Sequence, residues 1–345
     1  MKQFPTYFTD EEQLEEALSR PSTALVEMMR ELDGDFILLG VAGKMGVSMA
    51  YMAKRACAVA GVNKRIIGVS RFSDHQQRVF LEKRGIEIFQ GDLLDTIFIH
   101  SLPDVKNVIY LAGMKFGTDG NESFTWAMNA FLPGMVAEKF KKSRIVAFST
   151  GCVYPLIGIG SGGSLEEDNP QPIGEYAQSC LGRERMFEYG SKKYKTPVIL
   201  IRLNYAVEMR YGVLVDIAQK VLKEETIDIT MGHANVIWQG DANDMILRSI
   251  QYCASPAQKL NISGAEIISV VKIAQQFGEL MGKEVRFSGK EADSALLVNV
   301  SKSHSLLGTP KMDIDQIIKW TANWVGTKKR LLGKSTHFEV RDGKY

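Results

Sequence analysis

The chain has 345 residues, of which 45% are hydrophobic and 24% charged, and its formal net charge at pH 7 is +2. This composition is typical of a globular protein with one large core or two domains, and it favours neither a nucleic-acid nor a membrane partner. The four cysteines form no C-x-x-C pair and the five histidines lack ligand spacing, so we expect neither a disulfide framework nor a metal site. We find no signal peptide and no apolar run of membrane length, so we expect a cytoplasmic protein.

The first 34 residues are predicted to form a helical extension. Thr9 and Glu12 have the spacing of a capping box, which predicts a helix to about Ser19. Pro21-Ser22-Thr23 predicts the start of a second helix that ends near Asp33-Gly34. We expect this extension to serve packing or an oligomer contact rather than to act as a functional lid.

The next stretch, residues 36–60, has the pattern of a strand, a glycine turn and a helix. Four apolar residues from Phe36 to Leu39 suit a strand buried on both faces, and the helical segment begins at Val47. The turn between them contains three glycines at a spacing of three, Gly40, Gly43 and Gly46, and the residues Lys44 and Met45. Glycine permits a tight turn, a close phosphate approach and close packing of helix on strand. The pattern therefore predicts a site for the pyrophosphate of a dinucleotide at a helix N-terminus.

The end of the second predicted strand, residues 65–70, bears on the choice of cofactor. Ser70 is followed by Arg71, where a free ribose 2′-hydroxyl is usually held by an acidic residue. A 2′-phosphate is better matched by a cation and a hydroxyl, so Ser70, Arg71 and Lys44 favour NADP over NAD. The alternative is that Arg71 stacks on the adenine or lies in solvent.

Two further predicted strands, residues 86–89 and 105–111, lead to candidate cofactor contacts. The first precedes Asp92 and Leu93, where the carboxylate can accept a hydrogen bond from the adenine amino group. The second ends in Leu111-Ala112-Gly113, whose small residues let the backbone approach a cofactor closely. Strands alternate with helical stretches, which predicts a doubly wound α/β fold of the Rossmann type with a parallel sheet.

These motifs together resemble the extended short-chain dehydrogenase/reductases, the family of nucleoside-diphosphate-sugar epimerases and dehydratases. The resemblance runs from about residue 35 to 326 and includes Asn129, Ser149-Thr150-Gly151-Cys152-Val153-Tyr154 and Tyr176. It implies a dinucleotide domain over residues 35–205 that also receives part of 232–262. It further implies a smaller α/β substrate-binding part over residues 206–326, followed by a C-terminal tail over residues 327–345. It also implies a homodimer, and the helix around residues 125–141 is a candidate for its contact.

The resemblance implies roles for several side chains. Tyr176 is the expected acid/base, Thr150 the hydroxyl that hydrogen-bonds the reacting oxygen, and Leu203 a cofactor contact. Asn129 either holds a water or backbone carbonyl in the site or ties two segments together. The expected substrate contacts are Cys152, Asn204, Tyr205 and Trp238. Arg202 is expected to be a structural ion-pair partner. Trp238 stands where many sugar-nucleotide enzymes carry a basic residue that contacts the diphosphate.

The sequence departs from the family pattern at Cys180, which stands where a lysine should follow Tyr176 by one helical turn. An unperturbed phenol titrates near pKa 10, and a cation about 5 Å away lowers that pKa by about two units at an effective dielectric of 20. The absence of this lysine leaves three alternatives: another cation takes its place, the reaction runs slowly, or catalysis is lost. Lys115 is the first candidate for a replacement, and the alternative is an ordinary exposed loop lysine. We expect the Cys180 thiol to be an apolar filler rather than a nucleophile.

The sequence therefore predicts an NAD(P)-dependent oxidoreductase or epimerase that acts by hydride transfer on a sugar, a sugar acid or another hydroxy acid, or a nucleotide-sugar. A nucleotide-sugar epimerase or dehydratase proper is one alternative. A protein that binds NADP and senses its state without catalysis is the other.

Overall fold

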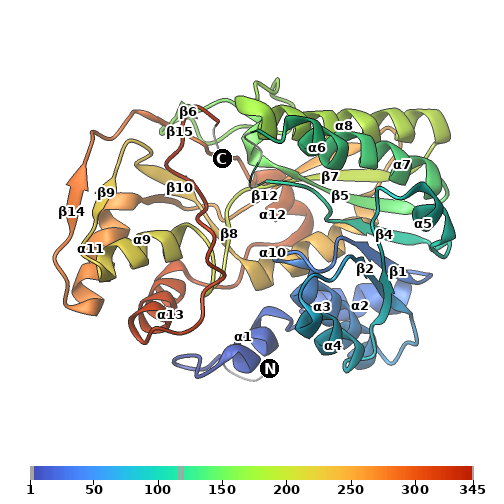
Figure 1. The fold of residues 1–345 in the computed structure, drawn as a ribbon, viewed down its shortest axis with the longest axis horizontal. Coiled ribbons are helices and arrows are strands. Elements are labelled where there is room, and N and C mark those ends of the chain that lie inside the picture. Colours follow the sequence, from blue (N-terminus) through green and yellow to red (C-terminus); the bar gives the residue numbers. More distant parts are fainter. Residues whose placement is uncertain (1–3, 116, 118–119, 344–345) are drawn as a thin grey trace.

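The computed structural model describes residues 4–115, 117 and 120–343, and these residues form two lobes that lie side by side (Figure 1). The α-helices are α1 (Glu11–Leu18), α2 (Thr23–Glu31), α3 (Gly46–Ala60), α4 (His75–Glu82), α5 (Thr96–Ser101), α6 (Glu122–Trp126), α7 (Leu132–Lys139), α8 (Gly174–Tyr194), α9 (Val213–Leu222), α10 (Gln239–Arg248), α11 (Val270–Met281), α12 (Ser301–Leu307) and α13 (Ile314–Gly326). A π-helical turn, η1 (Ala127–Phe131), joins α6 to α7, and short 3-10 helices are η2 (Gly151–Val153) and η3 (Ser249–Tyr252).

The larger lobe is built on a seven-stranded parallel sheet with the strand order β12-β7-β5-β4-β1-β2-β3. Its strands are β1 (Phe36–Leu39), β2 (Ile66–Ser70), β3 (Glu87–Gln90), β4 (Asn107–Tyr110), β5 (Arg144–Thr150), β7 (Val198–Leu203) and β12 (Gln258–Ile262). The strand order reverses between β1 and β4, which is where doubly wound sheets bind ligands beyond the carboxyl ends of their strands. The predicted Rossmann-type fold is therefore confirmed.

Two layers of helices cover the sheet, as the two buried faces of a parallel sheet require. Apolar side chains of α2, α3 and α10 pack on one face, and those of α5, α7 and α8 pack on the other. Every residue of β1 and of β4 is buried, which explains the continuous apolar run in the first strand. The cores on the two faces fix the carboxyl edge of the sheet as a rigid platform.

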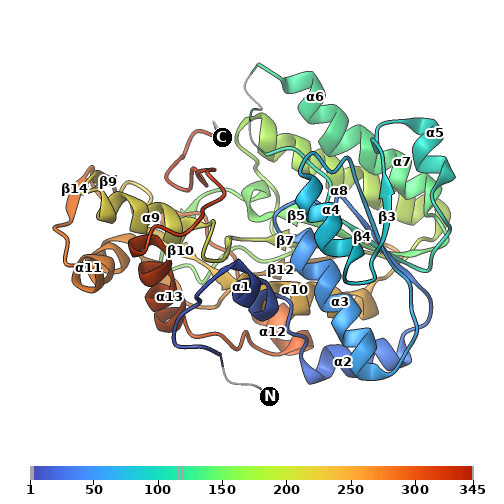
Figure 2. The same cartoon turned by 60° about the horizontal axis from the view of Figure 1, so that its bottom comes forward.

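The smaller lobe has its own core, formed mainly by α9, α11 and α13. Its short strands form pairs with one another rather than one large sheet. They are β6 (Ile157–Gly158), β8 (Ala206–Val207), β9 (Thr226–Asp228), β10 (His233–Asn235), β11 (Ile237–Trp238), β13 (Ile267–Ser269), β14 (Arg286–Ser288) and β15 (Ser294–Ala295). The N-terminal helix α1 packs near α13 and α10, and the C-terminal segment crosses between the lobes (Figure 2).

The N-terminal extension is helical, but its first cap differs from the prediction. The capping residue is Asp10, whose carboxylate accepts a hydrogen bond from the Gln13 backbone N–H at 2.9 Å. The Gln13 side chain accepts one from the Thr9 N–H at 3.2 Å, so the reciprocal bonds of a capping box form with different partners. The second helix is capped by Ser22, as predicted.

Candidate active site

The glycine loop lies between β1 and α3, at the point where the strand order reverses. Gly40 has a φ of +89°, and a Cβ added there would lie 2.7 Å from the backbone nitrogen of Ala112. A side chain at Gly46 would collide with the Val41 carbonyl. The loop therefore needs glycine for a left-handed turn and for close packing of α3 on the strand, and the N-terminus of α3 is left open toward a ligand.

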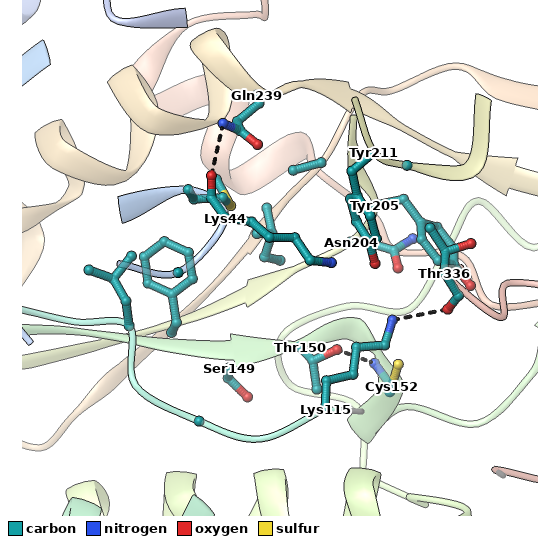
Figure 3. Close-up of a pocket in the computed structure, with 18 of the residues that line it drawn as sticks. Lys44, Lys115, Ser149, Thr150, Cys152, Asn204, Tyr205, Tyr211, Gln239 and Thr336 are labelled. Atoms are coloured by element: carbon teal, nitrogen blue, oxygen red, sulfur yellow. Dashed lines mark hydrogen bonds between the residues drawn. The ribbon is translucent and has the colours of Figure 1, made fainter. Parts of the chain in front are cut away.

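A cavity of about 250 Å³ lies between this loop and the smaller lobe. Its walls come from the glycine loop, the carboxyl ends of β4, β5 and β7, helix α8, the smaller lobe and Thr336 (Figure 3). The predicted site residues in its lining are Gly43, Lys44, Met45, Gly46, Leu111, Gly113, Lys115, Thr150, Cys152, Tyr176, Leu203, Asn204 and Tyr205. A larger hollow of about 670 Å³ borders the other side of the glycine loop, but neither Thr150 nor Tyr176 lines it. The smaller cavity is therefore the candidate active site.

Tyr176 and Thr150 meet in this cavity. Thr150 is the last residue of β5, Tyr176 stands in the first turn of α8, and their side chains are hydrogen-bonded to each other. The Thr150 hydroxyl also accepts a hydrogen bond from the Cys152 N–H at 3.1 Å. Burial raises the pKa of the Tyr176 phenol well above its usual value, and the neighbouring Cys180 and Cys152 thiols raise it further. The phenol is therefore protonated unless a nearby positive charge stabilises its anion.

Arg183 supplies such a charge, although the sequence analysis did not single it out. It follows Tyr176 by seven residues on α8, so two helical turns bring both side chains to the same face. Its guanidinium lies over the Tyr110 ring, 5.8 Å from the centroid, and it occupies the space that a side chain at Gly113 would need. The charge of Arg183 lowers the pKa of Tyr176 against the effect of burial. The seven-residue spacing was the signal that could have identified this residue.

The hydrogen bonds of Arg183 go to neutral oxygens. Nη1 donates to the Phe148 carbonyl at 2.9 Å and Nη2 to the Asn129 side-chain carbonyl at 2.6 Å. Nε is buried and has no hydrogen-bond partner among the described residues. The side chain is 6% exposed and lines the cavity. A buried cation with an unused donor next to a phenol is an arrangement suited to an anionic or polar ligand.

Asn129 ties the loop after β4 to α8. Its side-chain oxygen accepts a hydrogen bond from the Met114 N–H, and its amide donates to the Met114 carbonyl, both at 2.8 Å. The amide also donates to the Ser179 hydroxyl at 3.0 Å. Asn129 lies in the π-helical turn η1, a form that often marks functional sites. Of the two predicted roles for Asn129, the contacts favour holding segments and Arg183 in place.

Cys180 is completely buried among apolar side chains that include Val153, Tyr154 and Leu296. Burial raises the pKa of its thiol to about 11, so it stays protonated at neutral pH. The thiol is also hydrogen-bonded to Tyr176. A protonated, enclosed thiol is a filler rather than a nucleophile.

Lys115 points into the cavity rather than into solvent. Its Nζ donates a hydrogen bond to the Thr336 carbonyl at 3.2 Å, and the side chain passes close to Cys152 and Thr150 (Figure 3). Burial lowers its pKa. Lys44 extends from the glycine loop toward the same space and lies over the Tyr211 ring. Burial lowers the pKa of Lys44 to about 6, and the charges of Lys115 and Lys334 lower it as well.

The predicted substrate contact at Trp238 is wrong. Trp238 is 2% exposed and packs in the core of the smaller lobe, with its ring centroid 5.6 Å from that of Trp320 and 6.4 Å from that of Phe8. The N-terminal extension and α13 thus cover the position. Gln239, the next residue, lines the cavity instead and donates a hydrogen bond to the Ser48 hydroxyl at 3.1 Å.

The residues predicted to bind the adenosine end of a cofactor lie outside this cavity. Ser70 ends β2, while Arg71 and Asp92 follow β2 and β3 on the same edge of the sheet. The Arg71 guanidinium lies 3.9 Å from the Asp92 carboxylate, and both side chains are exposed. Leu93 is buried in the core, and Ala112 is buried against Gly40.

Residues 4–115, 117 and 120–343 contain no cluster of three or more histidine, cysteine or acidic side chains that could hold a metal ion. In the same part of the chain, no helix is long and apolar enough to cross a membrane.

Comparisons with known proteins support the fold. No family model and no curated protein matches the chain. A mutant UDP-glucuronic acid 4-epimerase from Bacillus cereus, solved with NAD and a fluorinated UDP-glucuronic acid, matches with a TM-score of 0.70 at 15% identity over 85% of this chain and 99% of that one. The dTDP-glucose 4,6-dehydratase of Bacillus anthracis, solved with NAD, has a TM-score of 0.71 at 16% identity over 85% and 97%. The UDP-glucose 4-epimerase of Thermotoga maritima has a TM-score of 0.69 at 16% identity over 85% and 99%. The chain thus has the fold that its motifs led us to expect.

Proposed function

We propose that the protein is an NAD(P)-dependent enzyme that transfers hydride between nicotinamide and a carbinol carbon of a carbohydrate-like substrate. The observation that carries this proposal is the contact between the Thr150 and Tyr176 side chains beside the glycine loop, with Arg183 next to them. The NAD-bound epimerase and dehydratase structures of the same fold add support by analogy.

The residues of the glycine loop fit a dinucleotide. The backbone of Lys44 and Met45 at the start of α3 would hold the pyrophosphate, and Leu111, Gly113 and Leu203 would lie along the cofactor. Ser70 and Arg71 would contact a 2′-phosphate, which favours NADP, with NAD as the alternative. The bound nicotinamide supplies the hydride acceptor or donor, and the chain supplies orientation and proton transfer.

The proton steps follow from the side chains. When a carbinol is oxidised, its C–H electron pair leaves as hydride and the phenolate oxygen of deprotonated Tyr176 takes the hydroxyl proton, which gives the neutral phenol. Thr150 donates a hydrogen bond to the reacting oxygen and keeps it next to Tyr176. Arg183 stabilises the phenolate in the role that a lysine has in the resembling family. In the reverse direction the same phenol returns the proton.

The test is a coenzyme assay with a paired variant. Calorimetry with NADP and with NAD should show binding of at least one of them, and a panel of polyols and sugar acids should produce a change in nicotinamide absorbance. Tyr176→Phe should keep coenzyme affinity and lower turnover by about a thousandfold, in the range expected of a general acid/base. Absence of binding for both coenzymes would contradict the proposal, and coenzyme binding without turnover would leave the sensor alternative.

The predicted homodimer and cytoplasmic location stay predictions. The helices around residues 125–141 carry exposed Trp126 and Phe131 side chains, which keeps them a candidate for a contact between copies.

A further inference from the structure

Two cations in the candidate active site have no part in the proton steps above. Lys44 comes from the glycine loop and Lys115 from the loop after β4, and their side chains enter the cavity from different walls (Figure 3). Both ammonium groups end near the wall formed by Tyr205, Tyr211 and Thr336. This wall belongs to the smaller lobe and the C-terminal segment, which is the substrate side of the cavity.

Two neutral groups of this wall contact the ammonium groups. Lys115 donates to the Thr336 carbonyl, and Lys44 lies over the Tyr211 ring. The negative charge of Asp216 also acts on both lysines, and its carboxylate accepts hydrogen bonds from the N–H and hydroxyl of Thr336 at 2.7 and 2.6 Å. Burial and the charge of Lys115 lower the pKa of Lys44 to about 6, so its amine is largely neutral at pH 7. An anion bound between the two side chains would favour the protonated form of Lys44 and balance the charge of Lys115.

The C-terminal segment, residues 327–343, limits the size of what this space can hold. It crosses between the lobes to the end marked C in Figure 1. Phe338 is 2% exposed, and the Arg341 guanidinium donates hydrogen bonds to the Thr230 carbonyl at 3.2 Å and the Ser294 carbonyl at 2.9 Å. Gly343 packs directly on the backbone of Gly174 at the start of α8. The segment is therefore anchored to both lobes.

The space beyond Cys152, away from the glycine loop, is largely filled by this segment. The hollow that remains there has a volume of about 20 Å³, and Val340, Arg341 and Gly343 form part of its lining. A nucleoside diphosphate attached to the reacting sugar would have to displace a built part of the protein.

We propose that the substrate is a small polyhydroxy carboxylate, rather than a nucleotide-linked sugar, and that its carboxylate binds between the ammonium groups of Lys44 and Lys115. The inference rests on the proposed function for the position of the reacting hydroxyl, next to Thr150 and Tyr176. A carboxylate held by two desolvated cations contributes charge-assisted hydrogen bonds, which are stronger than those between neutral groups. Lys44 thus serves the cofactor through its backbone and the substrate through its side chain.

The test measures binding to the full-length protein saturated with its coenzyme. Calorimetry compares aldonates and uronates, such as gluconate and glucuronate, with neutral partners, such as sorbitol for gluconate, and with UDP-glucuronate. We expect at least one acid to bind at least about tenfold more tightly than its neutral partner, and UDP-glucuronate to bind no more tightly than glucuronate. Equal binding of acids and neutral partners, failure of every acid to bind, or tighter binding of UDP-glucuronate would overturn the inference.

Lysine variants identify the cations. Lys115→Met and Lys44→Met should each reduce the preference for the acid by about tenfold, while Lys290→Met, at an exposed position, should not change it. If Lys44→Met and Lys115→Met weaken only coenzyme binding, the cofactor pyrophosphate is their anion and the inference is wrong. Acid binding without hydride transfer would contradict the proposed function alone, whereas hydride transfer confined to neutral alcohols or nucleotide-sugars would contradict only this inference.

Discussion

Two buried arginines, Arg202 and Arg183, show how differently this molecule uses positive charge. Arg202 is fully buried, and its guanidinium forms two hydrogen bonds with the Glu184 carboxylate at 2.9 and 2.8 Å. Arg183, the residue next to Glu184 in the chain, donates its hydrogen bonds to two neutral oxygens, and its Nε has no hydrogen-bond partner within the described part of the chain. One charge is balanced inside the protein, and the other is directed at a cavity.

The difference follows from the faces of α8. Glu184 points toward β5 and β7, where Ser149 donates a hydrogen bond to it at 2.6 Å and Arg202 pairs with it. Arg183 points toward Gly113 and the cavity, on the face of the helix that carries Tyr176. A buried cation that is paired with a carboxylate belongs to the structural framework of the fold. A buried cation that is hydrogen-bonded to neutral oxygens can still bind an anionic ligand. The expected structural role of Arg202 is confirmed.

The largest effect is expected from breaking the balanced pair. Arg202→Met leaves the Glu184 carboxylate buried without its counter-ion, so the free energy of unfolding should fall by about 3–5 kcal/mol. Urea unfolding followed by circular dichroism measures this loss. Arg183→Met leaves no carboxylate unpaired and should cost clearly less. Similar losses in the two variants would show that Arg183 is also mainly structural.

Arg183→Met should instead lower turnover, by about a hundredfold, because a nearby cation is worth about two pKa units to the phenolate. The charge of Arg183 lowers the pKa of Tyr176, so its removal raises that pKa. The rate of carbinol oxidation, which needs the deprotonated phenol, should therefore rise at a higher pH in the variant than in the wild type.

The control for this prediction is Arg185→Met on the same helix. The Arg185 side chain is half exposed, and Glu188 is its one ion-pair partner within the described residues. This variant should therefore keep the wild-type pH profile. Arg183→Lys should recover part of the turnover. A pH profile unchanged in Arg183→Met would remove Arg183 from the proton step.

Cys180→Lys should lower turnover by about tenfold, although it restores the residue type of the resembling family. The new ammonium group would lie in a completely buried position near the Arg183 guanidinium, so repulsion and lost packing should disturb the site. Cys180→Ala, which adds no charge, is the matched control. An increase in turnover would show that Arg183 does not fill the place of the missing lysine.

The smallest effect is a pH dependence of stability at Lys44. Its pKa is lowered to about 6 by burial and by the charges of Lys115 and Lys334, against the opposing charges of Asp216 and Glu208. Between that pH and the usual pKa near 10, the unfolded chain keeps a proton that the folded chain has lost, so stability rises with pH across this window. Below pH 6 the full cost of burying the charge is present.

Lys44→Met removes this cost. The variant should therefore be more stable than the wild type by about 1 kcal/mol or more at pH 6, and the gain should shrink toward pH 9. Denaturant unfolding at both pH values measures it, with Lys290→Met as the control. A gain that does not change with pH would contradict the lowered pKa.

The local parts of this protein could be predicted from the amino-acid sequence. The apolar run before the glycine triplet specified a buried strand and a turn, because Gly46 meets the backbone of Val41 and Gly40 meets that of Ala112, just after the adjacent strand β4. Alternating strands and helices then predicted the parallel sheet, and the motifs around Thr150 and Tyr176 led to two side chains that the structure brings together. Steric limits and periodicity act over short distances, so they can be read from neighbouring residues.

The directions of several charged and aromatic side chains depend instead on how distant segments pack together. Trp238 entered the core because the N-terminal extension and α13 cover it, and Lys115 entered the cavity because Thr336, 221 residues later, accepts its hydrogen bond. Arg183 became a candidate for the missing cation because α8 turns it toward Gly113 and leaves Glu184 to Arg202. The burial and pKa of a polar group depend on what distant segments place around it, and no local pattern contains that information.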